Sequence, residues 1–340
     1  MYHLVVLSEW EVMGLAEGLE WLWAGPGWLR YRALTDLLGR QPEAAEAVEA
    51  RRALLAEPSV VSVLGELAAW PGEALTHHND AKHPLHKLVF LADLGLRADD
   101  PGMAPAVERI LGQQSAEGAF QVVLNIPPRF GGSGQDQLAW MLCDSPSLIY
   151  SLARLGLGDD PRVQAAAGHL AGLARTNGWP CAVSPDCGRF RGPGRKDDPC
   201  PYATLLAVKA LSLLPEWRES EAVHAGAETL LALWDRRQQR RPYMFAMGRD
   251  FAKLKAPLIW YDLLHVVDVL TRLPWLHGDP RLAEMLALLR AKADAEGRFT
   301  AESVWLAWKD WEFGQKKTPS RWLALLARRA LRRVDHGLEV

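Results

Sequence analysis

The stretch LIYSLARLGLGDDPRVQAAAGHLAGLARTNGW, residues 148–179, contains the pattern that decides the fold. A first apolar run ends at Leu-Gly, an Asp-Pro turn follows, and a second apolar run ends at Asn-Gly-Trp. Proline is tolerated at the first position of a helix, an aspartate before it can cap that helix, and glycine suits the left-handed position after a helix. The stretch therefore predicts two helices joined by a short turn, with the second helix beginning at Pro161.

The same unit recurs along the chain. Pro42, Pro101, Pro161 and Pro280 follow one another at intervals of 59, 60 and 119 residues, and the last interval is two periods. Three of these prolines are followed 17 residues later by a glycine: Gly118, Gly178 and Gly297. A unit of this length fits a helix pair with its loops, and self-similarity at a fixed period is the signature of a repeat architecture.

Apolar residues within the units follow helical spacing. Leu282, Met285, Leu286 and Leu289 stand at i, i+3, i+4 and i+7, and no stretch shows convincing strand alternation. The fold class predicted is therefore all-α, with five or six helix pairs in a single domain over residues 1–340. The helix-pair repeats are expected at residues 28–57, 84–120, 143–180, 200–236 and 258–299, with a closing helix at 319–334.

Two all-α closures are compatible with such repeats: an open solenoid and a closed α/α toroid. Open solenoids usually have shorter repeats, whereas the connections here are long, especially residues 121–142 and 181–199. A toroid places the first helix of each pair inside and gathers the long loops over the mouth of a central cavity. We therefore expect an α/α toroid.

The segment GQQSAEGAF, residues 112–120, resembles the Gln-x-x-x-Gly-x-aromatic repeat motif of the terpenoid cyclase and protein prenyltransferase superfamily, through Gln114, Gly118 and Phe120. The whole chain is also similar to a group of uncharacterised bacterial squalene-cyclase-like repeat proteins. That similarity is carried by residues 25–43, 83–96 and 316–333. The resemblance implies an α/α toroid and an apolar, isoprenoid-like ligand in a central cavity.

The sequence also departs from this superfamily. Class II cyclases protonate their substrate through an Asp-x-Asp-Asp run, and this chain has none. Its acidic pairs, at residues 99–100, 159–160 and 197–198, each precede a proline and are interpreted as turn and cap residues. Protein prenyltransferases hold a catalytic zinc with an Asp and a Cys two residues apart and a distant His. The resemblance implies such a set here: Asp198, Cys200 and His265.

All four cysteines lie within one part of the chain, and the sequence favours their convergence. Cys143 and Cys200 begin consecutive first helices, and Cys181 and Cys187 lie in the loop that returns to the same end. Four thiolates can form a closed tetrahedral zinc site, which would make zinc a structural cofactor rather than a catalytic one. Free thiols, the Asp198–Cys200–His265 zinc set and two disulfides remain alternatives, of which disulfides are disfavoured in a cytoplasmic protein.

One polar stripe and one loop hold the candidate catalytic and cavity-mouth groups. Tyr261, His265 and Asp268 fall at i, i+4 and i+7 of a predicted inner helix, where Asp268 can orient His265 as a base beside Tyr261. A hydrogen-bonded stripe between helices explains the same spacing. The cavity-mouth loop HHNDAKHPLH carries further acid–base or ligand groups, which a solvated loop would also explain: His77, His78, Asp80, His83 and His86.

Composition excludes several classes of function. The net charge is −2, with 39 basic and 41 acidic residues, which argues against general nucleic-acid binding. The basic runs at residues 236–241 and 328–333 are interpreted as solvated helix faces. No apolar stretch reaches membrane-spanning length. The N-terminal residues 1–14 lack a basic start and a small-residue cleavage site, so a cytoplasmic protein is expected.

Three hypotheses for the function follow. The first is a cyclase-like or prenyltransferase-like protein of unproven activity that binds or transforms an apolar ligand. The second is a non-catalytic toroid that binds a ligand or a protein, with zinc as a structural staple. The third is an α/α-barrel carbohydrate enzyme, which needs two carboxylates that flank a cavity. The acids available for that role at the inner ends of the helices are Asp136, Asp144 and Asp262.

Overall fold

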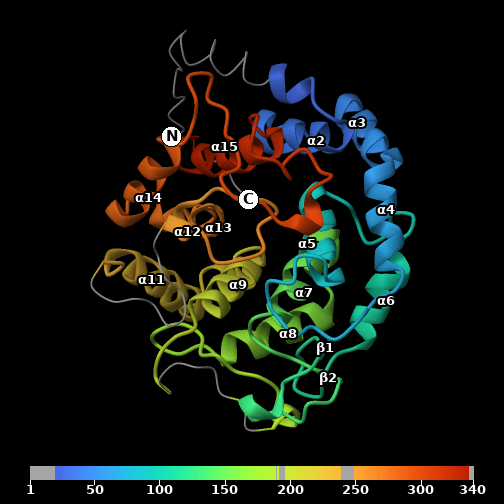
Figure 1. The fold of residues 1–340 in the computed structure, drawn as a ribbon, viewed down its shortest axis with the longest axis vertical. Coiled ribbons are helices and arrows are strands. Elements are labelled where there is room, and N and C mark those ends of the chain that lie inside the picture. The colour runs from blue at the N-terminus through green and yellow to red at the C-terminus, as the bar shows by residue number, and fades with distance from the viewer. Residues whose placement is uncertain (1–19, 189, 191–195, 239–248, 337–340) are drawn as a thin grey trace.

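The computed structural model describes residues 20–188, 190, 196–238 and 249–336, and within these ranges the chain is mostly helical, as predicted (Figure 1). The N-terminal stretch used for the cytoplasmic expectation and part of the basic run at 236–241 lie outside the described residues. None of the described helices combines the length and apolar character that a membrane crossing requires.

The helices follow one another in pairs with long connections. Residues 28–57 contain α2 (Gly27–Arg32), which continues as the π-helical turn η1 (Ala33–Leu37), and α3 (Ala45–Ala56). An additional helix, α4, spans Pro58–Leu67. The next two pairs are α5 (Pro84–Leu94) with α6 (Ala104–Gly112), and α7 (Ser145–Leu152), the π-helical turn η3 (Ala153–Leu157) and α8 (Pro161–Gly172).

The second half of the chain continues this order. It contains α9 (Pro201–Leu211), the short α10 (Pro215–Arg218), α11 (Glu221–Asp235), the short α12 (Arg249–Ala252), α13 (Leu263–Leu270), α14 (Pro280–Arg290) and α15 (Arg321–His336). Short 3-10 turns lie in the connections: η2 (Pro128–Phe130), η4 (Pro185–Cys187), η5 (Pro274–Leu276) and η6 (Leu306–Trp308).

The first helices of successive pairs pack side by side. Helix α5 contacts α7, α7 contacts α9, α9 contacts α13, and α13 contacts α15. Helix α15 in turn contacts α2, and α2 contacts α5, so the series of contacts returns to its start. The second helices α3, α8, α11 and α14 pack against the first helices from outside, which Figure 1 shows most clearly for α11 and α14.

The Asp-Pro turns act as predicted in two of three units. The Asp160 carboxylate accepts from the backbone N–H of Arg162 at the start of α8, and Asp279 accepts in the same way from Arg281 at the start of α14. Asp100 differs, because α6 begins at Ala104, after the turn. Its carboxylate instead accepts from the backbone N–H of Arg97 and pairs with Arg51 at 2.5 Å.

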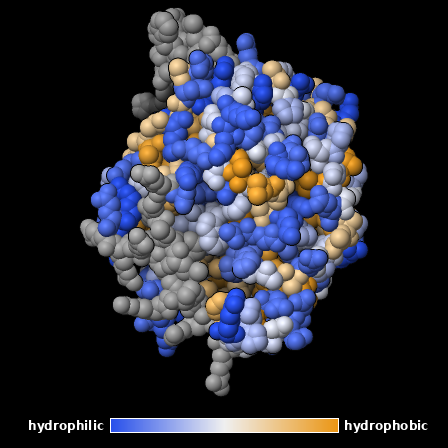
Figure 2. Space-filling model, in the orientation of Figure 1, coloured by the Kyte–Doolittle hydropathy of each residue, from blue (hydrophilic) through white to orange (hydrophobic). Residues whose placement is uncertain are grey.

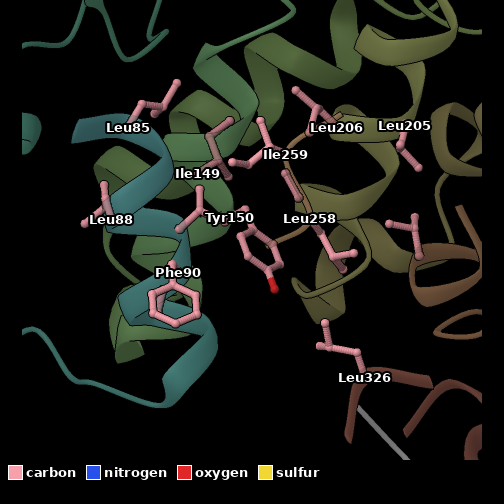
Figure 3. Packing of buried hydrophobic residues seen from close by; sticks show 14 of the residues in the cluster. Leu85, Leu88, Phe90, Ile149, Tyr150, Leu205, Leu206, Leu258, Ile259 and Leu326 are labelled. Carbon is pink, nitrogen blue, oxygen red and sulfur yellow. The ribbon is translucent and has the colours of Figure 1, made fainter. Parts of the chain in front are cut away.

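The core lies between the inner helices. Figure 3 shows Leu88 and Phe90 of α5, Ile149 and Tyr150 of α7, and Leu206 of α9 gathered in one apolar cluster. Burial of large apolar side chains is the main stabilising contribution to such a fold. The Tyr150 hydroxyl points toward the side of this view where Leu326 of α15 lies.

Aromatic residues join the two ends of the chain. Trp28 of α2 makes edge contacts with Phe90, Trp311 and Trp322, at centroid distances of 6.3, 5.3 and 5.7 Å. Such edge-to-face pairs contribute stability beyond their buried area. The first and last helices are therefore held to α5 by a shared aromatic cluster.

A small β-hairpin corrects the expectation of no strands. In the connection between α6 and α7, β1 (Val122–Leu124) pairs antiparallel with β2 (Gln137–Ala139). Three residues per strand are too few for alternation to be visible in the sequence. On the face of the molecule drawn in Figure 2, most residues are hydrophilic, with a small hydrophobic group near the centre.

Candidate functional site

The three predicted catalytic residues are all buried, and they do not form a His–Asp pair. Tyr261 is 4% exposed, and His265 and Asp268 in α13 are fully buried. His265 Nδ1 lies 2.8 Å from the carbonyl oxygen of Trp260, while its Nε2 has no hydrogen-bond partner. Burial lowers the pKa of His265 well below its usual value, so the ring is neutral.

The cavity-mouth histidines lie around the start of α5, and most have local structural partners. His83 caps α5 by accepting from the backbone N–H of Leu85, and His86 Nε2 lies 2.9 Å from the carbonyl oxygen of His78. Burial lowers the pKa of His86 to about 4. His77 is exposed and Asp80 is half-buried.

The carboxylates considered for carbohydrate chemistry are separated by their local roles. Asp144 is fully buried and lies 3.0 Å from His78 Nδ1, while Asp262 caps α13 by accepting from the backbone N–H of His265. Burial raises the pKa of Asp262 to about 7. Asp136 is exposed and accepts from Asn125.

Three of the four cysteines come together. Cys143 and Cys200 are buried with their Sγ atoms 3.9 Å apart, and the half-buried Cys181 hydrogen-bonds with both. These hydrogen bonds and burial raise the pKa of Cys143 well above its usual value. Cys187 lies in η4, where its thiol contacts Gln137.

Neither predicted zinc set forms a metal-binding arrangement in the described part of the chain. Asp198 is half-buried before α9, Cys200 caps α9, and His265 lies within α13. Among the described residues, no group of three or more His, Cys, Asp or Glu side chains is arranged to hold a metal ion. Both zinc assignments stay predictions.

The opposite ends of the inner helices carry a cluster of buried charges. Asp268 of α13 binds Arg272, two residues beyond the end of that helix, and it accepts from Arg329 at 2.9 Å and Arg333 at 3.2 Å, both on α15. Burial alone would raise the pKa of Asp268, but the three guanidiniums hold it well below its usual value. The residue proposed as an orienting acid is thus the anion of an arginine cluster.

Arg329 carries the cluster on to the first helix of the ring. The Nη1 atom of Arg329 lies 3.1 Å from the carboxylate of Asp36 in η1. The Nη2 atom of Arg32 in α2 lies 2.9 Å from the same carboxylate. Burial opposes ionisation, yet Arg32 and Arg329 lower the pKa of Asp36 to about 2. Helix α15 is therefore linked by charge to α2 and η1.

The cluster continues through Tyr150. Its hydroxyl donates to Asp93 at the end of α5, while Lys209 Nζ lies 4.4 Å from its ring centroid and Arg272 Cζ 5.2 Å from it. Cations over an aromatic face are attracted to its π electrons. Burial nevertheless lowers the pKa of Lys209 to about 8.

A pocket of about 550 Å³ opens onto this cluster. Four of its five basic lining residues come from three elements: Arg32 from α2, Arg154 from η3, and Arg329 and Arg333 from α15. The rest of the lining is Thr35, Asp36, Gly39, Arg40, Gln41 and Pro42. We call this space the arginine pocket. Both π-helical turns border it, and π-helical turns are frequent at functional sites.

Several donors of the arginines that line the pocket have no hydrogen-bond partner among the described residues. Buried nitrogen atoms without a hydrogen bond are Nε and Nη2 of Arg154, Nε of Arg32 and Nε of Arg329. Buried polar groups in folded proteins are almost always paired, and these three arginines all line the pocket. Anionic oxygens are the acceptors to which guanidinium groups bind most strongly.

The electrostatics favour the same ligand. Apart from the exposed Arg40, which pairs with Glu46, the basic groups in and behind the pocket outnumber the carboxylates Asp36, Asp93 and Asp268; they are Arg32, Arg154, Lys209, Arg272, Arg329 and Arg333. Burial lowers the pKa of Arg32 to about 10 and that of Arg333 to about 9. The pocket therefore holds excess positive charge where water screens it poorly.

The sequence prediction of solvated faces is wrong for Arg329 and Arg333, which are each 5% exposed. The sequence nevertheless contains a pattern that indicates the buried charge cluster, because one charged residue recurs near the end of each inner helix. These residues are Asp36, Asp93, Arg154, Lys209, Arg272 and Arg333, at intervals of 57, 61, 55, 63 and 61 residues.

Comparisons with known proteins do not assign the chain to a family. No protein-family model matches the chain, and no curated protein matches it. Among solved structures, the chain is similar to a crystal structure of a protein from Actinoplanes, with 16% sequence identity and a TM-score of 0.43. The match covers 95% of this chain and 99% of that one.

Proposed function

We propose that the protein is an α/α toroid that binds a small anionic molecule, bearing a phosphate or a carboxylate, in the arginine pocket. The toroid is supported by inner-helix contacts that run from α2 round to α15 and back to α2. The binding function rests on one observation above the others: Arg154 lines the pocket, and two of its side-chain nitrogens are buried without a hydrogen-bond partner in the part of the chain that the structure describes.

The chemistry of guanidinium fits this ligand class. Arginine presents planar, fixed N–H groups that match phosphate and carboxylate oxygens in a bidentate manner. The carboxylates nearby already pair with other arginines, since Asp36 binds Arg32 and Arg329 and Asp268 binds Arg272, Arg329 and Arg333. An external anion would therefore complete the hydrogen bonding of Arg154 and offset the excess positive charge.

This proposal develops the second of the sequence hypotheses, a ligand-binding toroid. A wholly apolar, isoprenoid-like ligand stays a prediction, and an amphiphilic molecule with an anionic head would meet both expectations. The pocket lining gives no pair of free carboxylates and no His–Asp pair, so we propose binding without assigning a reaction.

The test is calorimetric titration of the full chain at low ionic strength with inorganic phosphate and with pyrophosphate. We expect saturable binding to the native chain, at least about tenfold weaker in Arg154→Gln because a charge-assisted donor is lost. Arg236→Gln, which removes an exposed arginine bonded to the Ala232 carbonyl, is the matched control and should bind like the native chain. Equal binding by all three proteins, or none by any, would contradict the proposal.

A further inference from the structure

Three cysteines form a compact group at the end of the ring opposite the arginine pocket, and the backbone fixes their positions. Leu142 N donates to Ala182 O at 3.0 Å, beside the antiparallel bridge between Met141 and Val183. In this register, Cys143 faces Cys181. Cys200 joins them because its backbone N–H donates to Trp179 O at 2.7 Å. We call these three residues the thiol triad.

The members of the thiol triad differ in accessibility. Cys143 and Cys200 are 4% and 2% exposed, with their sulfur atoms 3.9 Å apart, and Cys200 Sγ also accepts from Ala203 N at the start of α9. Cys181 is half-buried and hydrogen-bonds with both. Cys181 is therefore the most exposed residue of the thiol triad, and it contacts the two buried members.

A histidine–aspartate pair lies beside the thiol triad. His78 Nδ1 is 3.0 and 3.1 Å from the two carboxylate oxygens of Asp144, the residue after Cys143. The pair places an imidazole, a group that can take up or release a proton, next to the three thiols.

We propose that Cys181 is a thiol–disulfide exchange site that passes a disulfide on to Cys143 or Cys200. The Cys181 thiolate attacks one sulfur of a small-molecule disulfide, forms a mixed disulfide and releases one thiol. Cys143 or Cys200 then attacks the Cys181 sulfur, the proton of the attacking thiol passes to the departing sulfur, and the second small-molecule thiol is released. The chain loses two electrons and two protons, and the small disulfide becomes two thiols.

The internal disulfide would add a covalent cross-link between a loop and the start of one inner helix. A bond from Cys181 to Cys143 would link the loop before α9 to the start of α7, and a bond to Cys200 would link it to the start of α9. Cys187 takes no part, because its thiol contacts Gln137 in another part of the loop region.

The experiment incubates the reduced full chain with oxidised glutathione and counts free thiols by mass spectrometry after rapid alkylation. The expected result is a loss of two thiols and a Cys181–Cys143 or Cys181–Cys200 peptide in the non-reducing digest. Cys187→Ser is the matched control and should form the same bond at the same rate. Cys181→Ser should lose thiols at least about tenfold more slowly, because the remaining two triad thiols are buried.

Three results would overturn the proposal. They are a bond that includes Cys187, a stable glutathione adduct on Cys181 with no internal bond, and a purified chain with bound zinc and an unreactive thiol triad. Because peptide mapping of the native chain identifies the bond directly, the proposal can be tested even where a variant folds poorly.

Discussion

Arg329 Nη2 donates to the Asp268 carboxylate at 2.9 Å, and this buried contact joins α15, the last helix of the ring, to α13. Through Nη1 the same guanidinium reaches Asp36, so it also joins α15 to the first pair. The packing of α15 against α13 and η1 therefore depends on charges that are removed from water. A buried ion cluster is strongly destabilised when one member is lost, because the others remain buried without a partner.

Asp268→Asn tests that dependence. The substitution keeps the size of the side chain but leaves Arg272, Arg329 and Arg333 without their shared anion. We expect the free energy of unfolding to fall by about 3–5 kcal/mol in urea denaturation. Asp250→Asn, which removes an exposed carboxylate paired with Lys253, should leave the urea midpoint unchanged. A midpoint for Asp268→Asn equal to that of the control would contradict the structural role of the cluster.

Replacement of Arg154 is expected to stabilise the protein, whereas replacement of Asp268 is expected to destabilise it. Its Nε and Nη2 atoms lack partners, and its charge lowers the pKa of Arg32, which marks repulsion between the two groups. In buffer without multivalent anions, Arg154→Gln should raise the free energy of unfolding by about 1 kcal/mol, or Tm by about 2 °C. Calorimetric melting of the two proteins measures this difference. A clear loss of stability would show that Arg154 has a structural partner.

Anions should stabilise the native chain according to their charge. Ligands that bind only the folded state raise its stability by an amount set by their concentration relative to Kd, about 2.7 kcal/mol at a hundredfold excess. At matched ionic strength, phosphate and sulfate should therefore raise Tm more than chloride does. The difference should shrink in Arg154→Gln. An equal response in both proteins would point to a general salt effect.

The pH dependence of stability should reveal the titration of the buried Lys209 side chain. Its pKa is lowered by burial from 10.5 in the unfolded chain to about 8 in the folded one. Between these values the unfolded state binds more protons, so the contribution of Lys209 to stability rises as pH increases from about 8 to 10.5. The difference in unfolding free energy between the native chain and Lys209→Met should change in favour of the native chain across this window. A constant difference would show that Lys209 does not titrate there.

Local patterns predicted most of the helices because the information is local. The i, i+3, i+4, i+7 spacing from Leu282 lies within α14, and Asp160 and Asp279 cap the helices that follow them. The same reasoning predicted that Asp100 caps the next helix, and this was wrong. Helix α6 begins only at Ala104, and the Asp100 carboxylate pairs with Arg51 in an earlier unit. Such a partner, 49 residues away, leaves no trace in a local pattern.

The candidate site could not be predicted from local patterns either, because its residues bind partners that are far away in the sequence. Asp268 stands at a spacing that suggests a partner for His265, yet its partners Arg329 and Arg333 are about one repeat further along the chain. The run of arginines near the C-terminus has the composition of a solvated face, and only the packing of α15 against α13, η1 and α2 shows that two of them are buried. Comparing charged residues at equivalent positions of the repeats would have identified the cluster.

Anomalous diffraction from a crystal soaked in tungstate tests the central claim most directly, because it locates an oxyanion rather than inferring it. The arginine pocket should give a strong tungsten peak within hydrogen-bond distance of the Arg154 and Arg32 guanidiniums, and that peak should be absent from Arg154→Gln. An empty pocket, with peaks only on exposed arginines such as Arg236, would contradict the proposed anion site.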